Sequence, residues 1–476
     1  MPAGPRTFYL IAIGGTAMTP LASLLVERGE RVLGSDGPLY PPMSDRLAAL
    51  GIEVRPAWNA SNLPTDSTRV VVGNLARADN PELQEALRRG LPVVSMPETL
   101  RTEILVGRHP VVVAGTHGKT TTTALAAWLL ASAGRDPGFL VGGEPLNFDT
   151  PARMGTGAAF VVEGDEYSTS YADKGPKFLH YAPRTFVVTS VEFDHADLFP
   201  DLVAVKEAFR KGVAIVPPDG RIVAFADDPG VRDVLGGARA PVTFYSLADD
   251  GAELAARNVL TSGDGLSFEV LRRGAPLLSA SLPLSGLHNA ANALAAVAVA
   301  LEFDLSPAEI AAGLASFRGV KRRMEVLGTA GGVTVIDDFA HHPTAVASTL
   351  DGSKRRFPGR RVWAAFEPRS MTAGRADFEG PYFAALSKAD AVALAAPFHA
   401  ARLSQPGGPG ALDAPALVAK LRAAGKPAMT ADTPQALLKT LIHELRPGDV
   451  VVSMSSGAFD GFPAKLLAAL AAREPR

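Results

Sequence analysis

Residues 111–123 read VVVAGTHGKTTTT: an apolar strand, a glycine turn, and then a lysine that opens a helix rich in alanine and leucine. Backbone N–H groups of such a loop point at phosphate oxygens, and the helix presents the positive end of its dipole. Lys119 supplies a mobile charge, and the Thr120 hydroxyl can reach a magnesium ion. The spacing is unusual because Val113 stands where a common phosphate loop has glycine. The segment still predicts an ATP or GTP site, since a plain strand-to-helix turn does not explain the lysine.

Length and composition limit the class of protein. The chain has 476 residues, 47% of them hydrophobic, and a net charge of −2, so several domains are expected and no electrostatic surface for nucleic acid or an anionic membrane is indicated. The absence of cysteine excludes disulfides, thiolate metal sites and cysteine nucleophiles. Its longest apolar stretches, such as residues 294–301, are far shorter than the roughly 20 residues that cross a bilayer, and the first residues lack a secretory pattern. We therefore expect a soluble, cytoplasmic enzyme with no nucleic-acid or membrane partner.

Three blocks follow one another, and each begins with a predicted strand, a glycine turn and a helix. Strands are predicted at residues 8–13, 31–33, 69–72 and 92–95 in the first block, at 111–114, 159–163, 185–189 and 221–225 in the second, and at 333–336, 362–366 and 449–454 in the third. Alternating polarity over residues 265–282 is typical of antiparallel strands. The β-α alternation elsewhere predicts an α/β protein with parallel sheets.

A second glycine turn lies near the N-terminus. Residues 14–18, GGTAM, separate a predicted strand from a helix, and Asp36 ends the next strand about 20 residues later. Glycines of this kind let the backbone approach a pyrophosphate, and the acid takes a ribose hydroxyl. The third glycine of the dinucleotide pattern is missing, so NAD, another nucleotide diphosphate and a turn needed only for packing all remain open. Asn74, after another strand, is a weaker candidate.

Two acidic segments follow buried strands of the second block. They are residues 163–166, EGDE, and residues 192–197, EFDHAD. Catalytic and metal ligands collect at the carboxyl ends of parallel strands, so Glu166 and His195, together with Thr120, are candidate ligands or water-mediated ligands of magnesium. The alternative is that both segments are solvated loops. The spacing matches none of the usual zinc patterns.

Four further polar segments are candidates for substrate contact. Residues 286–292, GLHNAAN, precede an alanine-rich helix, where Asn289 is also a natural helix cap. Residues 321–323, KRR, can supply an arginine to a γ-phosphate or form a solvated charge cluster. In residues 337–343, DDFAHHP, the adjacent histidines point apart, which favours a nucleotide or substrate contact over a shared metal. Residues 367–370, EPRS, end an apolar strand with an arginine suited to a substrate carboxylate.

These motifs, in this order, resemble the Mur ligase family, the ATP-dependent enzymes that add amino acids or peptides to the UDP-muramyl precursor of the bacterial cell wall. The resemblance runs from Gly14 to about Gly461. It is strongest to the murein peptide ligase branch, which joins the tripeptide L-alanyl-γ-D-glutamyl-meso-diaminopimelate to UDP-N-acetylmuramate in the recycling of cell-wall peptides. The alternative is the branch that adds free L-alanine to UDP-N-acetylmuramate. That branch typically carries a Gln-Pro-His-Arg type sequence where this chain has Glu367-Pro368-Arg369.

The resemblance implies three domains: an N-terminal Rossmann-like domain for UDP (1–107), a central P-loop ATPase-type domain with a mixed sheet (108–322) and a C-terminal Rossmann-like domain for the peptide (323–476). The implied UDP-substrate residues are Gly15, Thr16, Ala17, Met18, Ser35, Asp36 and Asn74. The implied ATP residues are Gly115, Thr116, His117, Gly118, Lys119, Thr120, Thr121, Asn292 (adenine), Arg323 (phosphate), Asp338 (ribose) and His342. The implied magnesium ligands are Thr120, Glu166 and His195. The implied catalytic residues are Lys119, Glu166, His195 and Arg323, and the implied peptide contacts are Arg369, Ser370 and Ser455.

Several positions depart from the family pattern. Arg210 stands where some members carry a carbamylated lysine, and Gly164, Ser168, Thr189, Ser190, Ala458 and Asp460 also differ from the expected residues. These departures bear on substrate positioning more than on reaction class. Of the unrelated alternatives, an NAD-dependent oxidoreductase leaves Lys119 without a role, and a nucleotide switch without ligase chemistry leaves the candidate metal ligands and the third domain unexplained.

Overall fold

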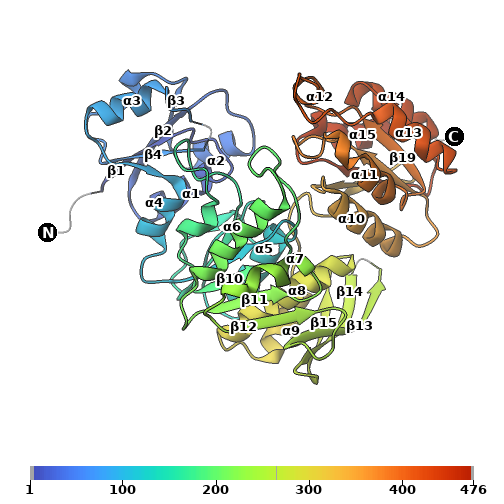
Figure 1. The fold of residues 1–476 in the computed structure, drawn as a ribbon, viewed down its shortest axis with the longest axis horizontal. Helices are drawn as coiled ribbons and strands as arrows, with labels where there is room; N and C mark the ends of the chain where they lie inside the picture. Colours follow the sequence, from blue (N-terminus) through green and yellow to red (C-terminus); the bar gives the residue numbers. More distant parts are fainter. Residues whose placement is uncertain (1–4, 75, 264, 473–476) are drawn as a thin grey trace.

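Three α/β domains, each built on its own sheet, make up the protein. The computed structural model describes residues 5–74, 76–263 and 265–472. In Figure 1 the N-terminal domain is blue, the central domain runs from cyan to yellow, and the C-terminal domain is orange to red, with the central domain below the other two. The predicted fold class, three α/β domains with Rossmann-like outer domains and a mixed central sheet, is confirmed.

The N-terminal domain has a parallel five-stranded sheet in the order β3-β2-β1-β4-β5, which is the strand order of a dinucleotide-binding fold. Its elements are β1 (Thr7–Ile11), α1 (Met18–Glu27), β2 (Arg31–Asp36), α2 (Met43–Ala49), β3 (Glu53–Pro56), η1 (Ala60–Asn62), β4 (Arg69–Val72), α3 (Pro81–Arg88), β5 (Val93–Ser95), α4 (Met96–Thr99) and η2 (Leu100–Ile104). The first strand is shorter than predicted because Ala12, at φ +63°, already belongs to the turn.

The central domain has a ten-stranded mixed sheet in the order β15-β14-β13-β12-β11-β10-β6-β9-β7-β8. Its elements are β6 (His109–Ala114), α5 (Lys119–Ser132), β7 (Gly138–Leu140), β8 (Ala152–Arg153), β9 (Ala159–Gly164), η3 (Lys177–His180), β10 (Thr185–Val188), α6 (Leu202–Ala214), β11 (Arg221–Phe225), α7 (Pro229–Val234), η4 (Leu235–Gly237), β12 (Val242–Ser246), β13 (Leu254–Ser262), β14 (Gly265–Arg272), β15 (Ala275–Leu282), α8 (Leu287–Glu302) and α9 (Pro307–Ala315). Strands β13, β14 and β15 pair antiparallel, as the alternating pattern predicted.

The C-terminal domain has a six-stranded sheet in the order β16-β17-β21-β18-β19-β20, parallel except for the edge strand β16. Its elements are β16 (Glu325–Ala330), β17 (Val333–Asp338), α10 (Pro343–Arg356), β18 (Val362–Phe366), η5 (Ala376–Phe378), α11 (Glu379–Leu386), β19 (Ala391–Ala395), α12 (Ala400–Leu403), α13 (Ala414–Ala423), β20 (Ala428–Ala431), α14 (Pro434–Glu444), β21 (Val450–Met454), η6 (Phe459–Gly461) and α15 (Phe462–Ala471).

The centre of the middle sheet brings three polar loops together. Strands β10, β6 and β9 are neighbours and parallel, so the segments after their carboxyl ends leave the sheet at one edge. Those segments are the phosphate loop, the acidic residues after β9 and the acidic loop after β10. The buried, alanine-rich helices α5 and α8 pack together beside them. In the part of the chain that the structure describes, no helix has the length and apolarity needed to span a membrane.

Candidate active site

The phosphate loop requires glycine at two positions. Gly118 is the N-cap of α5 at φ +82°, in the left-handed region, and Gly115 lies at φ +140°. A Cβ atom on Gly115 would lie 2.0 Å from Oγ1 of Thr189. The loop is also held to the end of β10, because the Thr116 N–H donates to the Ser190 carbonyl at 3.0 Å and the His117 N–H to the Ser190 hydroxyl at 2.8 Å. Ser190, one of the departures from the family pattern, therefore helps to shape the loop.

Lys119 is held inside its own loop by a carboxylate. Its Nζ donates to the Gly115 carbonyl at 2.6 Å and lies 2.8 Å from Oε2 of Glu166. Burial disfavours the ammonium charge, but Glu166, Glu163 and Asp165 outweigh it, so the pKa of Lys119 is raised above its ordinary value. The lysine is therefore cationic and aimed at the loop that binds phosphate in such folds.

A second carboxylate, Glu163, contacts the hydroxyl of Thr120, which is the predicted magnesium ligand. Oγ1 of Thr120 donates to Glu163 at 3.1 Å, and the Gly142 N–H donates to the other carboxylate oxygen at 2.8 Å. Burial raises the pKa of Glu163, opposed by Lys119. Magnesium prefers oxygen ligands, so Thr120 and Glu163 fit it. Glu163 belongs to the acidic segment 163–166 but was not predicted as a ligand; its place as the last side chain of β9 before Gly164 was the available signal.

Arg323 reaches this group from the start of the C-terminal domain. Its Nη2 donates to Oγ1 of Thr120 at 3.0 Å, and its guanidinium lies 4.8 Å from the ring centroid of Phe339. Burial lowers the pKa of Arg323, opposed by Asp338 and Glu163. The neighbouring Arg322 instead pairs with Asp337 and donates to the Ser455 and Gly457 carbonyls. The structure thus distinguishes the two arginines that the sequence motif left equivalent.

The acidic loop after β10 also meets the C-terminal domain. His195, at φ +55°, packs its ring on Tyr167 with centroids 4.3 Å apart. Asp194 is buried and lies 3.5 Å from the His341 ring; despite burial, the neighbouring histidines hold its pKa well below the ordinary value. The Ala196 N–H donates to the Thr372 hydroxyl at 2.8 Å. The role of His195 as a magnesium ligand stays a prediction.

The two histidines predicted for ATP converge on one carboxylate. Nε2 of His117 lies 2.9 Å, and Nδ1 of His342 lies 3.2 Å, from Oε2 of Glu192. Burial lowers the pKa of His342 to about 4. Burial opposes the charge of Glu192, but His117 and His342 outweigh it and lower its pKa to about 2. Glu192 is a further residue that the sequence analysis did not single out.

Asn292 and Asp338, the predicted adenine and ribose contacts, are both buried and already bonded. Oδ1 of Asn292 accepts from the Thr122 hydroxyl at 3.2 Å and lies against Gly118 of the loop. Asp338 accepts from the N–H groups of Met324 at 2.7 Å and Ala340 at 2.8 Å. Asn292 therefore lies at the ATP loop and Asp338 at the domain boundary. Their contacts with a nucleotide stay predictions.

The N-terminal turn is shaped by Asp36, which accepts from the N–H groups of Gly14 and Gly37, each at 2.7 Å. Thr16 and Asn74 are exposed at this end of the sheet. Ser35 faces the other way, because its hydroxyl is buried and donates to Glu82. The structure therefore leaves Thr16 and Asn74, with the partly exposed Asp36, as the accessible part of the predicted UDP site, whereas Met18 and Ser35 are buried.

The predicted peptide residues gather at the end of β18. Ser455 donates to the buried Glu367 carboxylate at 2.6 Å, and Nη1 of Arg369 lies 3.5 Å from the same carboxylate. The Arg369 guanidinium stacks on Phe398 at 3.8 Å. Ser370 accepts from the Ala373 N–H at 2.9 Å. A positioned arginine of this kind can bind a carboxylate, and its role toward a peptide stays a prediction.

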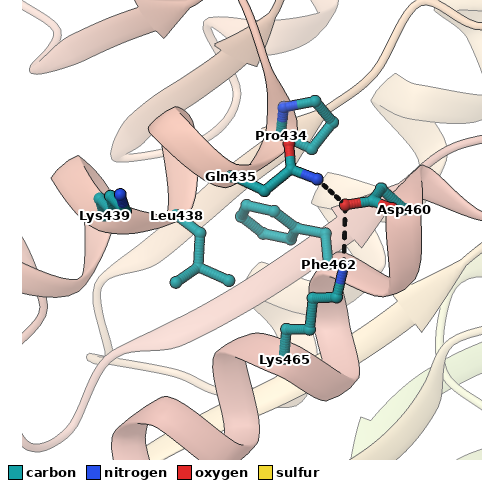
Figure 2. A pocket seen from close by; sticks show the side chains of 7 residues that line it. All are labelled: Pro434, Gln435, Leu438, Lys439, Asp460, Phe462 and Lys465. Carbon is teal, nitrogen blue, oxygen red and sulfur yellow. Dashed lines mark hydrogen bonds and ion pairs between the residues drawn. The ribbon is translucent and has the colours of Figure 1, made fainter.

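A separate small pocket lies between α14 and α15 (Figure 2). Figure 2 shows Leu438 and Phe462 lining it, with Asp460 bonded to Gln435 and Lys465. The polar groups of Gln435, Asp460 and Lys465 are thus paired with one another. None of the predicted site residues lines it, so the pocket is distinct from the candidate active site.

Three stretches of the chain match domains of one family. Residues 7–105 match the Mur ligase family catalytic domain, residues 113–300 the Mur ligase middle domain, and residues 322–457 the Mur ligase glutamate ligase domain. These matches follow the order of the three sheets.

Individual relatives are similar over almost the whole chain. The UDP-N-acetylmuramate–L-alanyl-γ-D-glutamyl-meso-2,6-diaminoheptandioate ligase of Escherichia coli is 37% identical, over 97% of this chain and 98% of its own. The UDP-N-acetylmuramate–L-alanine ligase of Burkholderia cenocepacia is also 37% identical, over 97% of both chains. The crystal structure of a murein peptide ligase from Psychrobacter arcticus has a TM-score of 0.72 and 34% identity, covering 98% of this chain and 99% of its own. The chain therefore belongs to the Mur ligase family, whose members are ATP-dependent enzymes that form amide bonds.

Proposed function

We propose that this enzyme uses ATP to join the tripeptide L-alanyl-γ-D-glutamyl-meso-diaminopimelate to UDP-N-acetylmuramate, in the recycling of cell-wall peptides. The observation that carries the reaction class is the meeting of Lys119, Thr120 and Arg323 at one loop, with Arg323 supplied from the boundary of the next domain. The choice of substrates is supported by the similarity to the Escherichia coli and Psychrobacter arcticus ligases and by Arg369 in the sequence Glu367-Pro368-Arg369.

The first step is attack of the lactyl carboxylate of UDP-N-acetylmuramate on the γ-phosphorus of ATP, which forms an acyl phosphate and ADP. Lys119 and Arg323 stabilise the charge on the transferring phosphoryl group. Thr120 and Glu163 are the residues available to hold magnesium, with His195 as a further predicted ligand, and magnesium would supply further charge neutralisation at the phosphates. Glu166, the other ligand predicted from the sequence, is instead paired with Lys119 in this structure. Lys119 must exchange the Glu166 carboxylate for phosphate oxygens as ATP enters, since its Nζ is bonded to that carboxylate in this structure.

The second step is attack of the L-alanyl amine on the carbonyl carbon of the acyl phosphate, with loss of phosphate. In this proposal the C-terminal domain delivers the amine, and Arg369, which stacks on Phe398 and lies beside Glu367, binds a carboxylate of the peptide. Contacts between the loop after β10 and the C-terminal domain, such as Ala196 with Thr372, lie where closure would keep water from the acyl phosphate. The residues 15–18 and Asp36 would hold the UDP part at the N-terminal domain.

The test is phosphate release from ATP in the presence of UDP-N-acetylmuramate. Release should be fast with the tripeptide and slow with free L-alanine. Lys119→Ala should abolish it, whereas Lys439→Ala, which removes an exposed lysine of α14, should leave it unchanged. Equal or faster turnover with free L-alanine would assign the enzyme to the L-alanine-adding branch instead, and turnover that survives Lys119→Ala would contradict the role of the loop.

A further inference from the structure

Three side chains from distant parts of the chain point their ligand atoms at one another beside the phosphate loop. His117 belongs to that loop, Glu192 to the loop after β10, and His342 is the N-cap of α10 in the C-terminal domain. One atom of each, the Glu192 oxygen and a nitrogen of each histidine, lies within 4.8 Å of the other two. The two nitrogen-to-oxygen distances are 2.9 and 3.2 Å. The three residues are called the His-Glu-His cluster below.

The hydrogen bonds of His342 fix which of its nitrogens carries the proton. Its Nε2 lies 3.2 Å from the Phe193 carbonyl oxygen, which can only accept, so Nε2–H is the donor. Its Nδ1 accepts from the Thr344 N–H at 3.3 Å, so this nitrogen carries a lone pair. A lone pair therefore lies 3.2 Å from a carboxylate oxygen of Glu192. Two acceptors at this distance repel each other unless a cation lies between them.

The donor set and the spacing suit zinc. Two imidazole nitrogens and one carboxylate oxygen form the His2Glu set of open zinc sites, in which a fourth position is left for water or a ligand. Bonds of about 2.1 Å at tetrahedral angles place ligand atoms about 3.4 Å apart. The two nitrogen-to-oxygen distances are slightly shorter than this value, and all three atoms lie within 4.8 Å of one another, so small side-chain rotations bring them to the required spacing. Imidazole favours zinc, whereas magnesium prefers the oxygen donors at Thr120 and Glu163. The Nδ1 contact with Thr344 is long, so coordination displaces only a weak cap bond.

We propose that the His-Glu-His cluster binds one Zn²⁺ ion when no nucleotide is bound, and that this ion fastens the C-terminal domain to the phosphate loop. The site is separate from the one proposed for magnesium, and the inference does not depend on which peptide the enzyme accepts. Zinc patterns are usually read from the spacing of neighbouring residues. The spacing around residues 192–197 matches no zinc pattern, because the proposed ligands come from three segments that only the fold brings together.

The experiment is a calorimetric titration of Zn²⁺ into the full-length, nucleotide-free protein in excess Mg²⁺, which occupies the oxygen sites. Glu192→Gln keeps the shape of the side chain, and His342→Asn keeps a residue that caps helices well. The matched controls are His443→Ala, an exposed histidine of α14, and Glu163→Gln, which alters the proposed magnesium site. Thermal unfolding of each variant verifies that it is folded.

The wild type and both controls should bind one equivalent of Zn²⁺, and the two cluster variants should bind it at least about tenfold more weakly. Zn²⁺ should also raise the unfolding temperature of the wild type more than that of the cluster variants, because a ligand that binds only the folded state stabilises it. Equal affinity in the wild type and the folded cluster variants would overturn the proposal. So would the absence of a one-to-one site in the wild type, which would leave the cluster as hydrogen bonds alone.

Discussion

Glu163 and Glu166 are separated by two residues, yet their substitution should affect the enzyme differently. Glu163 accepts from the Thr120 hydroxyl at 3.1 Å, whereas both oxygens of Glu166 face Lys119, at 3.0 and 2.8 Å. Glu163→Gln therefore removes a carboxylate beside the Thr120 hydroxyl, the predicted magnesium ligand. Glu166→Gln removes the partner of the loop lysine. The two glutamines keep the shapes of the side chains, so the comparison isolates the charges.

The expected magnitudes follow from these contacts. Loss of a group that supports a metal typically weakens metal binding 10- to 100-fold, or about 1.4–2.7 kcal/mol, so Glu163→Gln should raise the half-saturating Mg²⁺ concentration by at least about tenfold. Glu166 is 3% exposed and Lys119 is 14% exposed. Removing one member of such a buried pair costs about 3 kcal/mol or more, so Glu166→Gln should lower stability and turnover while leaving the half-saturating Mg²⁺ concentration near the wild-type value.

The assay is phosphate release from ATP with saturating UDP-N-acetylmuramate and tripeptide, measured over a wide range of Mg²⁺ concentrations. Thermal unfolding of both variants measures the change in stability separately. If Glu166→Gln raised the half-saturating Mg²⁺ concentration and Glu163→Gln did not, magnesium would be assigned to Glu166 and the reasoning from the Thr120 contact would be refuted. Equal increases in both variants would refute the division of roles.

Three further outcomes are expected. Arg323→Lys should lower kcat about 100-fold in the same assay with little change in unfolding temperature, because a lysine cannot both reach Thr120 and present a planar fork to phosphate; unchanged kcat would contradict this. Gly115→Ala should destabilise the fold and abolish turnover, since the new Cβ would meet Thr189, and chemical denaturation with the turnover assay measures both. Glu103→Gln should cost about 1–2 kcal/mol at neutral pH, because it leaves three partly exposed arginines without their shared carboxylate. Burial disfavours the charge of Glu103, but the three arginines outweigh burial and lower the pKa of Glu103 below the ordinary 4.5. The contribution of Glu103 to folding stability is therefore present above pH 4.5 and is lost as the pH falls below that value. Denaturation curves of the variant and the wild type should accordingly converge in acid.

Local patterns were enough to predict most of the strands that position the site. Residues 221–225 and 362–366 were predicted with the observed limits, because apolar runs bounded by turn residues specify buried strands locally. Other strands, both at sheet edges and inside sheets, escaped the same argument. Strand β16 was missed because it is half exposed, contains Gly328 and pairs with an irregular register, so its sequence lacks a clear period.

The sequence by itself determined the chemistry that is available: a loop with Lys119 and Thr120, carboxylates at strand ends, and arginines at the second domain boundary. Backbone conformation and strand ends depend on neighbouring residues, so these features can be found locally. Only the tertiary structure decided which groups meet. The order β10-β6-β9 brings Glu163 to Thr120. The packing of the C-terminal domain against the central domain gives Arg322 and Arg323 different partners and joins His117, Glu192 and His342. Such pairings depend on how sheets and domains pack, and the free energy of that packing is spread over residues far apart in the chain.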